Sequence, residues 1–150
     1  MDDTDRLLLT LIQREFPLSE RPYAEIAEKA GVAESEAIAR IEAMREEGFI
    51  RRMGASLNPR ALGYVSTLAA ARVAPGKIDS AAEYVNRFVE VTHNYERDDA
   101  FNMWFTVIAR DEAAVAAIID DIRNNSGADE VIDLPATHIF KIKVNFDLTK

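Results

Sequence analysis

The hydrophobic pattern of this 150-residue chain changes near residue 60, and this change constrains the fold more than any other feature. Before it, apolar residues recur at the three- and four-residue spacing of amphipathic helices. After it, they largely alternate, as in strands that bury one face. Turn-forming residues fill the junction at 58–63. We therefore predict an α+β chain of two modules, residues 1–60 and residues 61–150.

Three helices are predicted in the first module. The first is expected to start at Thr4 or Asp5 and to stop at Pro17. The second is expected to run from Pro22 to Gly31, and the third to start at Glu34 or Ser35 and to stop at Gly48. The short glycine turn between the second and third helices is typical of a helix-turn-helix. Residues 49–56 are short, partly alternating and broken by glycine, which predicts the strand or hairpin of a wing. The first module is therefore predicted to be a winged helix-turn-helix.

The second module predicts the order strand, helix, strand, strand, helix, strand. The expected strands are 64–74, 91–96, 101–109 and 131–146, and the expected helices are 78–89 and one that begins after the cap Asp111 and ends at 124–127. This βαββαβ order is that of the ferredoxin-like fold. Its open sheet leaves one face for a partner.

Three residue clusters lie within this architecture. They are residues 48–55 (GFIRRMGA), residues 93–95 (HNY) with 102–106 (NMWFT), and residues 134–137 (LPAT) with 140–142 (FKI). The order of the two modules resembles the Lrp/AsnC proteins over nearly the whole chain. With these clusters, the chain is similar to the siroheme decarboxylases of the alternative heme pathway, whose close relatives serve heme d1 synthesis.

The resemblance implies a lyase that removes carbon dioxide from the acetate side chains at positions 12 and 18 of siroheme and yields 12,18-didecarboxysiroheme. It also implies a heterodimer with a paralogous second subunit. The segment at residues 137–143, near the end of the chain, is similar to that of the alpha-type subunit. No separate cofactor is implied, because the iron arrives with the tetrapyrrole substrate. Another interpretation is a catalytically silent subunit that completes the active site of its partner.

Composition excludes several other classes of protein. The chain has no cysteine, which excludes a disulfide framework, a thiolate metal cluster and a cysteine nucleophile. Its acidic start lacks the basic flank of a signal peptide, and no apolar run approaches the roughly 20 residues that span a bilayer. We therefore expect a cytoplasmic protein that does not bind membranes.

Charge argues against specific DNA binding. The net charge is −8, and the helix expected at 34–47, which would enter the major groove, holds five glutamates and two arginines. Arg51 and Arg52 in the expected wing can touch phosphates, but two arginines are few for that role. We expect no specific DNA binding. The alternative is an Lrp/AsnC-like transcription regulator that senses a small ligand.

Siroheme carries eight carboxylates around a planar iron macrocycle, so its site needs cations at the rim and apolar or aromatic walls. The expected cations are Arg51, Arg52, Arg97, Lys141 and Lys143. If the last strand is regular, Lys141 and Lys143 share one of its faces. Arginine binds carboxylates with two hydrogen bonds, so Arg51 and Arg52 are the stronger candidates. Each cation alone is also consistent with an ordinary solvated surface charge.

Loss of an acetate carboxylate leaves a carbon that must take a proton, so the reaction needs a general acid. Histidine changes charge near neutral pH, which makes His93 the leading donor and Tyr95 the reserve. His93 can instead ligate the siroheme iron, since imidazole suits iron. His138 has the same two interpretations, and we expect the protein to supply no other metal ligand.

The neighbours of His93 depend on the register of the hairpin. If Asp98-Asp99 alone form the turn, His93 opposes Trp104 and Tyr95 opposes Asn102, which makes a polar and aromatic cluster on one face. Asn94 and Trp104 are further candidates for contact with the substrate. In the alternative register, His93 opposes Met103 and Tyr95 opposes Phe101, which makes a hydrophobic core face. His93 is then a packed, hydrogen-bonded core residue.

Overall fold

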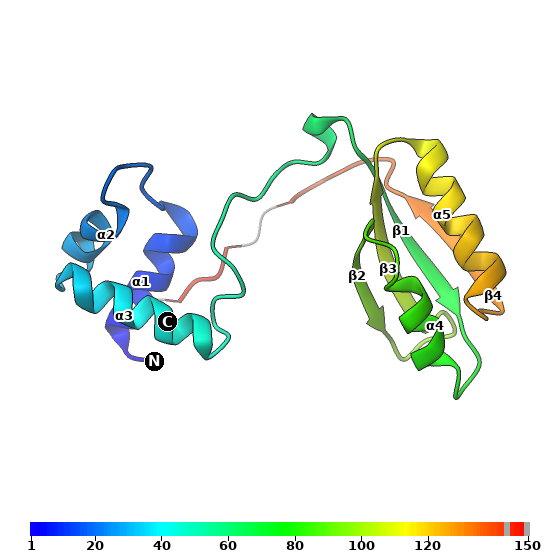
Figure 1. The fold of residues 1–150 in the computed structure, drawn as a ribbon, viewed down its shortest axis with the longest axis horizontal. Helices are drawn as coiled ribbons and strands as arrows, with labels where there is room; N and C mark the ends of the chain where they lie inside the picture. The colour runs from blue at the N-terminus through cyan, green and yellow to red at the C-terminus, as the bar shows by residue number, and fades with distance from the viewer. Residues whose placement is uncertain (143–144, 149–150) are drawn as a thin grey trace. The chain divides into compact units, whose positions relative to one another are not determined.

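The computed structural model describes residues 1–142 and 145–148 and divides the chain into two compact units (Figure 1). Unit 1 comprises Met1–Ala55 with Lys141–Lys150, and unit 2 comprises Ser56–Phe140. Each unit has its own cluster of buried apolar side chains. The chain therefore forms two cores of separate composition, which are described in turn.

Unit 1 contains the three predicted helices. They are α1 (Asp3–Arg14), α2 (Pro22–Ala30) and α3 (Glu34–Glu46). The predicted first cap is wrong, because Asp2 caps α1: its side chain accepts from the Asp5 N–H, and the Asp5 side chain accepts from the Asp2 N–H. Gly31 ends α2 in the left-handed conformation, at φ 70°, which a glycine adopts without steric cost. The helix-turn-helix prediction is confirmed.

The core of unit 1 is formed where the apolar stripes of the three helices meet. Its buried residues are Leu8, Ile26, Ala27, Ala37, Ile41, Met44 and Ile50. The predicted wing strand is wrong, because residues 49–57 are irregular. Phe49 and Met53 in this segment are exposed, and no neighbouring strand of unit 1 in the described residues supplies a hydrogen-bonding partner.

Unit 2 has the predicted βαββαβ order, preceded by a short 3₁₀ helix, η1 (Arg60–Leu62). Its elements are β1 (Val65–Arg72), α4 (Ile78–Val85), β2 (Val91–Glu96), β3 (Met103–Ala109), α5 (Glu112–Asn125) and β4 (Glu130–Pro135). The four strands lie in the order β2-β3-β1-β4, and each pair of neighbours is antiparallel. This topology confirms the ferredoxin-like prediction.

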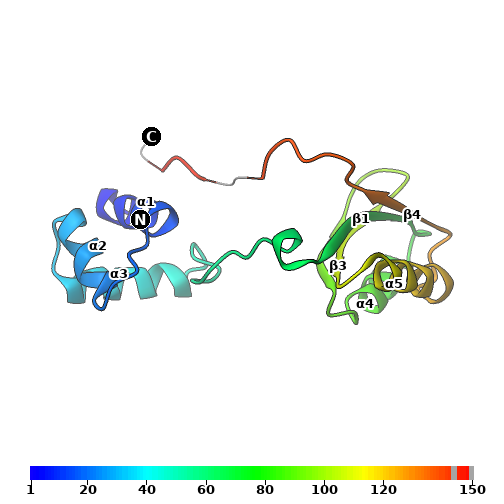
Figure 2. The same ribbon diagram turned by 90° about the horizontal axis from the view of Figure 1, so that it is seen from above.

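The helices α4 and α5 both lie on one face of the sheet (Figures 1 and 2). The core between helices and sheet includes Phe105 and Val107 of β3 and the fully buried Ala69 and Ala71 of β1. Alternate residues of these strands therefore point toward the helices. Ala69 and Ala71 lie in this layer, where β1 packs against α5.

Several elements are shorter than predicted, α4 and β4 by the most. The helix α4 ends at Val85 rather than Val89, and β4 ends at Pro135 rather than at residue 146. The pairing of β4 with β1 reaches only as far as Pro135 opposite Thr67. Proline has no N–H to donate to a strand ladder, so regular pairing stops there. The described residues beyond Pro135 have no regular secondary structure.

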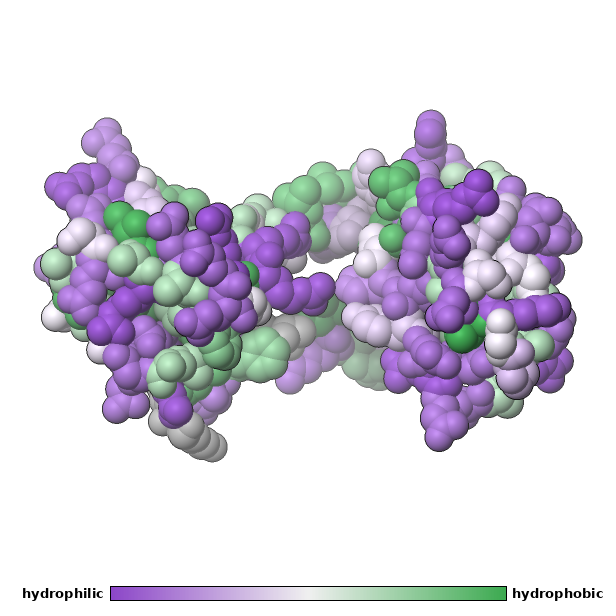
Figure 3. Space-filling view, turned by 60° about the horizontal axis from the view of Figure 1, so that its bottom comes forward, coloured by the Kyte–Doolittle hydropathy of each residue, from purple (hydrophilic) through white to green (hydrophobic). Residues whose placement is uncertain are grey.

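Purple hydrophilic residues dominate the face drawn in Figure 3, and the green apolar patches on it are small. Within the described residues, no helix combines the length and the apolar character needed to cross a membrane.

Candidate functional site

The hairpin of β2 and β3 pairs in a register that the sequence analysis did not predict. Tyr95 lies opposite Trp104, and His93 lies opposite Thr106. The Arg97 N–H donates to the Asn102 carbonyl at 2.8 Å, so residues 98–101 form the loop. Both predicted registers are wrong because the observed loop of residues 98–101 is longer than the Asp98-Asp99 turn of the first and than the turn with one more residue of the second.

The register shows which side chains share the face of the sheet that α4 and α5 leave uncovered. Residues directly opposite on neighbouring strands lie on the same face. We call this surface the open face. Its two central rows are His93, Thr106, Leu68 and Leu134, and Tyr95, Trp104, Ala70 and Ile132.

Apolar and aromatic groups make up much of the open face, and several of them are exposed. Tyr95 is 53% exposed, and Leu68 and Leu134 are each 42% exposed. None of these three residues belongs to either core. A four-stranded face with this exposure can take a flat apolar or aromatic ring.

His93 lies exposed on this face and is not a core residue. Its ring stacks near that of Tyr95, with centroids 6.2 Å apart and planes 27° apart. Its Nδ1 lies 3.0 Å from the hydroxyl oxygen of Thr92. The interpretation of His93 as a packed core histidine is therefore wrong.

Arg97 and Trp104 form the edge of the same cluster. The Arg97 guanidinium lies 5.9 Å from the centroid of the Trp104 ring, within the range of a cation–π contact. The Trp104 indole N–H donates to the Phe101 carbonyl at 2.6 Å, which ties the indole to the hairpin loop. The structure thus brings four predicted site residues together: His93, Tyr95, Arg97 and Trp104.

Asn94 lies on the other face of β2. It pairs with the buried Phe105, and its side-chain N–H donates to the Asn86 side-chain oxygen at 3.0 Å. Its own side-chain oxygen is buried without a hydrogen-bond partner. Adjacent residues of a strand point to opposite faces, so Asn94 is separated from His93 and Tyr95.

The remaining predicted site residues lie outside regular structure. Arg51 and Arg52 are exposed in the irregular segment that follows α3. His138 is exposed beyond the end of β4, where its ring lies 4.7 Å from that of Phe140. Lys141 is also exposed, and Lys143 lies outside the described residues. Because β4 ends at Pro135, strand alternation does not place Lys141 and Lys143 on a common face.

The structure adds residues that sequence reasoning missed. Thr92 is one, and Arg72 is another: it follows Ala70 by two positions on β1 and so continues the open face. Its guanidinium pairs with Glu130 at 2.6 Å and lies 5.9 Å from the Phe101 ring. Alternation within β1 predicts that Arg72 shares a face with Ala70. Only the order of the strands shows that this face also carries the residues of β2 and β3.

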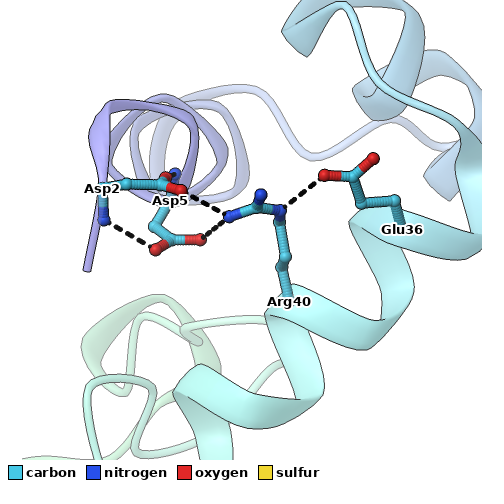
Figure 4. Close-up of polar contacts among 4 residues, drawn as sticks. All are labelled: Asp2, Asp5, Glu36 and Arg40. Atoms are coloured by element: carbon cyan, nitrogen blue, oxygen red, sulfur yellow. Dashed lines mark hydrogen bonds and ion pairs between the residues drawn. The ribbon is translucent and has the colours of Figure 1, made fainter.

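The helix α3 is poorly suited to phosphate binding. One of its two arginines, Arg40, forms ion pairs with Asp2 at 2.8 Å, with Asp5 at 2.9 Å and with Glu36 at 2.9 Å (Figure 4). The side-chain hydrogen bond from Arg40 to Asp2 raises the pKa of the guanidinium. The pKa of Asp2 is lowered, first by the Asp5 N–H and then by Arg40. Arg40 therefore stabilises unit 1 rather than presenting a charge to DNA.

Two hollows in the surface are lined by residues other than the predicted site residues. One, of about 250 Å³, is lined by Tyr84, Arg87, Phe88 and Asp121, and the other, of about 210 Å³, by Tyr23, Ile38, Ile41, Glu42, Arg45 and Met53. Neither contains a predicted site residue. In the part of the chain that the structure describes, no group of three or more His, Cys, Asp or Glu side chains is placed to hold a metal ion.

Comparison with known families gives two matches. A family described as the AsnC-like ligand binding domain matches residues 61–141. One described as the siroheme decarboxylase NirDL-like HTH domain matches residues 5–51. The siroheme decarboxylase alpha subunit of Nitratidesulfovibrio vulgaris is 45% identical over 146 residues, which cover 97% of this chain and 82% of that protein.

Solved structures show the same architecture. An AsnC family transcriptional regulator from Agrobacterium tumefaciens is 26% identical with a TM-score of 0.81, over 99% of this chain and 97% of that one. The siroheme decarboxylase NirDL, in complex with an iron-uroporphyrin III analogue, is 27% identical with a TM-score of 0.70, over 95% of this chain but 48% of that one. The regulator shares the fold at 26% identity, whereas the decarboxylase alpha subunit is 45% identical to this chain. On its sequence and its fold, the chain belongs to the siroheme decarboxylase family.

Proposed function

We propose that this chain is an alpha-type siroheme decarboxylase subunit that acts as a carboxy-lyase in heme biosynthesis. The reaction converts siroheme to 12,18-didecarboxysiroheme by removing carbon dioxide from the C12 and C18 acetates. The open face carries this proposal, because it places an imidazole, a phenol and an indole side by side in a chain 45% identical to such a subunit. A cytoplasmic location stays a prediction.

The macrocycle binds against the open face. Its planar surface suits the aromatic rings of Tyr95 and Trp104 and the exposed apolar side chain of Leu68. Arg97, beside Trp104, is placed to meet a carboxylate at the edge of the ring. The other proposed contacts to substrate carboxylates come from Arg51, Arg52, His138, Lys141 and Lys143. Asn94 is not among them, because its side chain points away from the open face.

Decarboxylation breaks the bond between the acetate carboxylate and its methylene carbon. Carbon dioxide leaves, the electron pair enters the conjugated macrocycle, and the carbon then takes a proton to become a methyl group. We assign the proton to His93, with Tyr95 as the reserve donor, because both are exposed on the open face. The alternative role of His93 is as an axial ligand to the substrate iron.

A paralogous second subunit completes the enzyme. Two observations support this part of the proposal. The open face of the single chain is exposed, and the chain spans only 48% of the NirDL chain that it matches. A partner that covers this face would exclude water from the bound tetrapyrrole, which strengthens the ionic contacts to its carboxylates.

Anaerobic incubation of siroheme with the purified chain, alone and with its paralogue, tests the reaction by product mass. We expect loss of two carbon dioxide molecules per siroheme in the complete enzyme. Full activity of the paralogue alone would make this chain catalytically dispensable. If only the pair is active, the His93 variant described below decides whether this chain is a silent subunit.

The AsnC-family neighbour favours one competing function, a regulator that binds DNA. A regulator needs measurable affinity for duplex DNA that falls as the salt concentration rises. We expect no such binding even at low salt, since α3 and its C-cap Glu47 together carry five glutamates and Arg40 of α3 is already ion-paired. Salt-dependent DNA binding together with unchanged siroheme would favour the regulator.

A further inference from the structure

The strand β2 contains a β-bulge beside His93. Val91 pairs with Val107 and His93 pairs with Thr106, so the two residues 92 and 93 lie opposite a single position of β3. In a regular strand, neighbouring side chains point to opposite faces and cannot meet. A bulge re-aims a side chain, and bulges are frequent next to active sites.

The bulge brings two neighbouring side chains into contact. The hydroxyl oxygen of Thr92 lies 3.0 Å from Nδ1 of His93. Val91, before the bulge, packs against the core of unit 2, and Asn94, after His93, again points away from the open face. The irregularity therefore affects only the residues that meet at the imidazole.

We propose that Thr92 is a positioning residue whose hydroxyl oxygen accepts a hydrogen bond from Nδ1–H of His93 and leaves Nε2 as the reactive ring atom. The importance of Nε2 as the reactive atom rests on the proposed function. The contact itself is independent of that function. A histidine's second nitrogen is commonly fixed in this way by its hydrogen-bond partner.

The same arrangement serves both proposed roles of His93. As an acid, the imidazolium donates from Nδ1 to Thr92 and gives its Nε2 proton to the substrate carbon, after which the neutral ring keeps the Nδ1 proton and the same hydrogen bond. As an iron ligand, the neutral ring uses the Nε2 lone pair and again keeps the Nδ1 proton. In both cases the ring orientation and the proton position stay fixed.

The tautomer of His93 can be measured directly by ¹⁵N NMR of the imidazole nitrogens in the whole chain, at a pH where the ring is neutral. We expect the Nδ1–H tautomer, whereas free histidine favours Nε2–H. His138 is the other histidine of the chain and serves as an internal reference. The His138→Asn variant assigns the signals.

Two substitutions separate the hydroxyl from the shape of the side chain. Thr92→Val keeps the branched shape and is expected to return His93 to the Nε2–H tautomer, while Thr92→Ser keeps Nδ1–H. In the complete enzyme, we expect Thr92→Val to lower kcat about tenfold with little change in KM, and Thr92→Ser to restore most of it. Circular dichroism of each variant verifies the fold.

The outcomes separate this assignment from the proposed function. A neutral Nε2–H tautomer in the unmodified chain, or an Nδ1–H tautomer that survives in Thr92→Val, would overturn the role of Thr92. The expected tautomers in a chain that leaves siroheme unchanged would uphold the contact between Thr92 and His93 and reject the decarboxylase. Equal kcat values in the two Thr92 variants would remove the contact from catalysis.

Discussion

Tyr95 and Trp104 lie directly opposite each other on β2 and β3, and both side chains belong to the open face of the sheet. Cross-strand neighbours have Cβ atoms about 5 Å apart, so a ligand that stacks on one ring also lies against the other. This pair places the aromatic part of the proposed tetrapyrrole site next to His93.

Trp104 is the single tryptophan of the chain, which makes its fluorescence a direct probe of the open face. We expect siroheme to quench this fluorescence in a saturable manner, because the excited indole transfers its energy to a macrocycle bound close to it. A parallel titration of free N-acetyltryptophanamide, which does not bind siroheme specifically, corrects for inner-filter effects. Siroheme that binds by its own absorbance change yet leaves the tryptophan signal intact would place the site elsewhere.

We expect His93→Ala to lower turnover by about 100-fold or more, since a positioned acid contributes at least that much, while siroheme binding persists. Product mass against time gives the rate, and the absorbance of bound siroheme gives the affinity. His138→Ala, which removes an exposed imidazole beyond β4, is the comparison and should have the smaller effect. Unchanged turnover in His93→Ala would remove this histidine from the mechanism.

The double variant Arg51→Ala with Arg52→Ala is expected to weaken siroheme binding more than it lowers kcat, because surface arginines pair with carboxylates in substrate and transition state alike. The effect should shrink as salt is added, since exposed ion pairs are screened. Arg60→Ala, which removes another cation close in sequence, is the matched control. A loss of kcat at saturating siroheme would instead place these arginines at the reacting acetates.

The Asp2 carboxylate predicts a loss of stability in acid. Its pKa is lowered from the ordinary value of 3.8 in the folded state, so its contribution is present above 3.8 and is lost as the pH falls below that value. Asn caps helices as well as Asp but does not titrate in this range. The thermal midpoint, followed by the helical circular dichroism signal, should therefore decrease less on acidification in the Asp2→Asn variant than in the unmodified chain. Equal decreases in both would contradict the role assigned to this carboxylate.

Local sequence signals correctly predicted most of the helices and strands. Pro22 and Gly31 mark the limits of α2, Asp111 caps α5, and the predicted range of β2 is the observed one. Each of these signals acts within a few residues, through a fixed proline φ, a left-handed glycine or a side chain that accepts from a free helix N–H. Such effects require no knowledge of distant parts of the chain.

The local signals failed where pairing partners were needed. The alternation of residues 49–56 predicted a wing strand, yet no strand within the described part of the chain pairs with them to complete a ladder. The last strand was predicted to continue to residue 146, yet its ladder with β1 ends at Pro135. A strand is stable only with its neighbours, and those come from elsewhere in the sequence.

The sequence by itself therefore determined the order of helices and strands and the resemblance to the siroheme decarboxylases, and it predicted His93, Tyr95 and Trp104 as site residues. The tertiary structure decided which of the predicted residues share a surface. Loop length set the register of β2 on β3, and a shift of one position moves a side chain to the opposite face of a sheet. Strand alternation places Asn94 on the face opposite to His93 and Tyr95, and the bulge in β2 brings Thr92 into contact with His93.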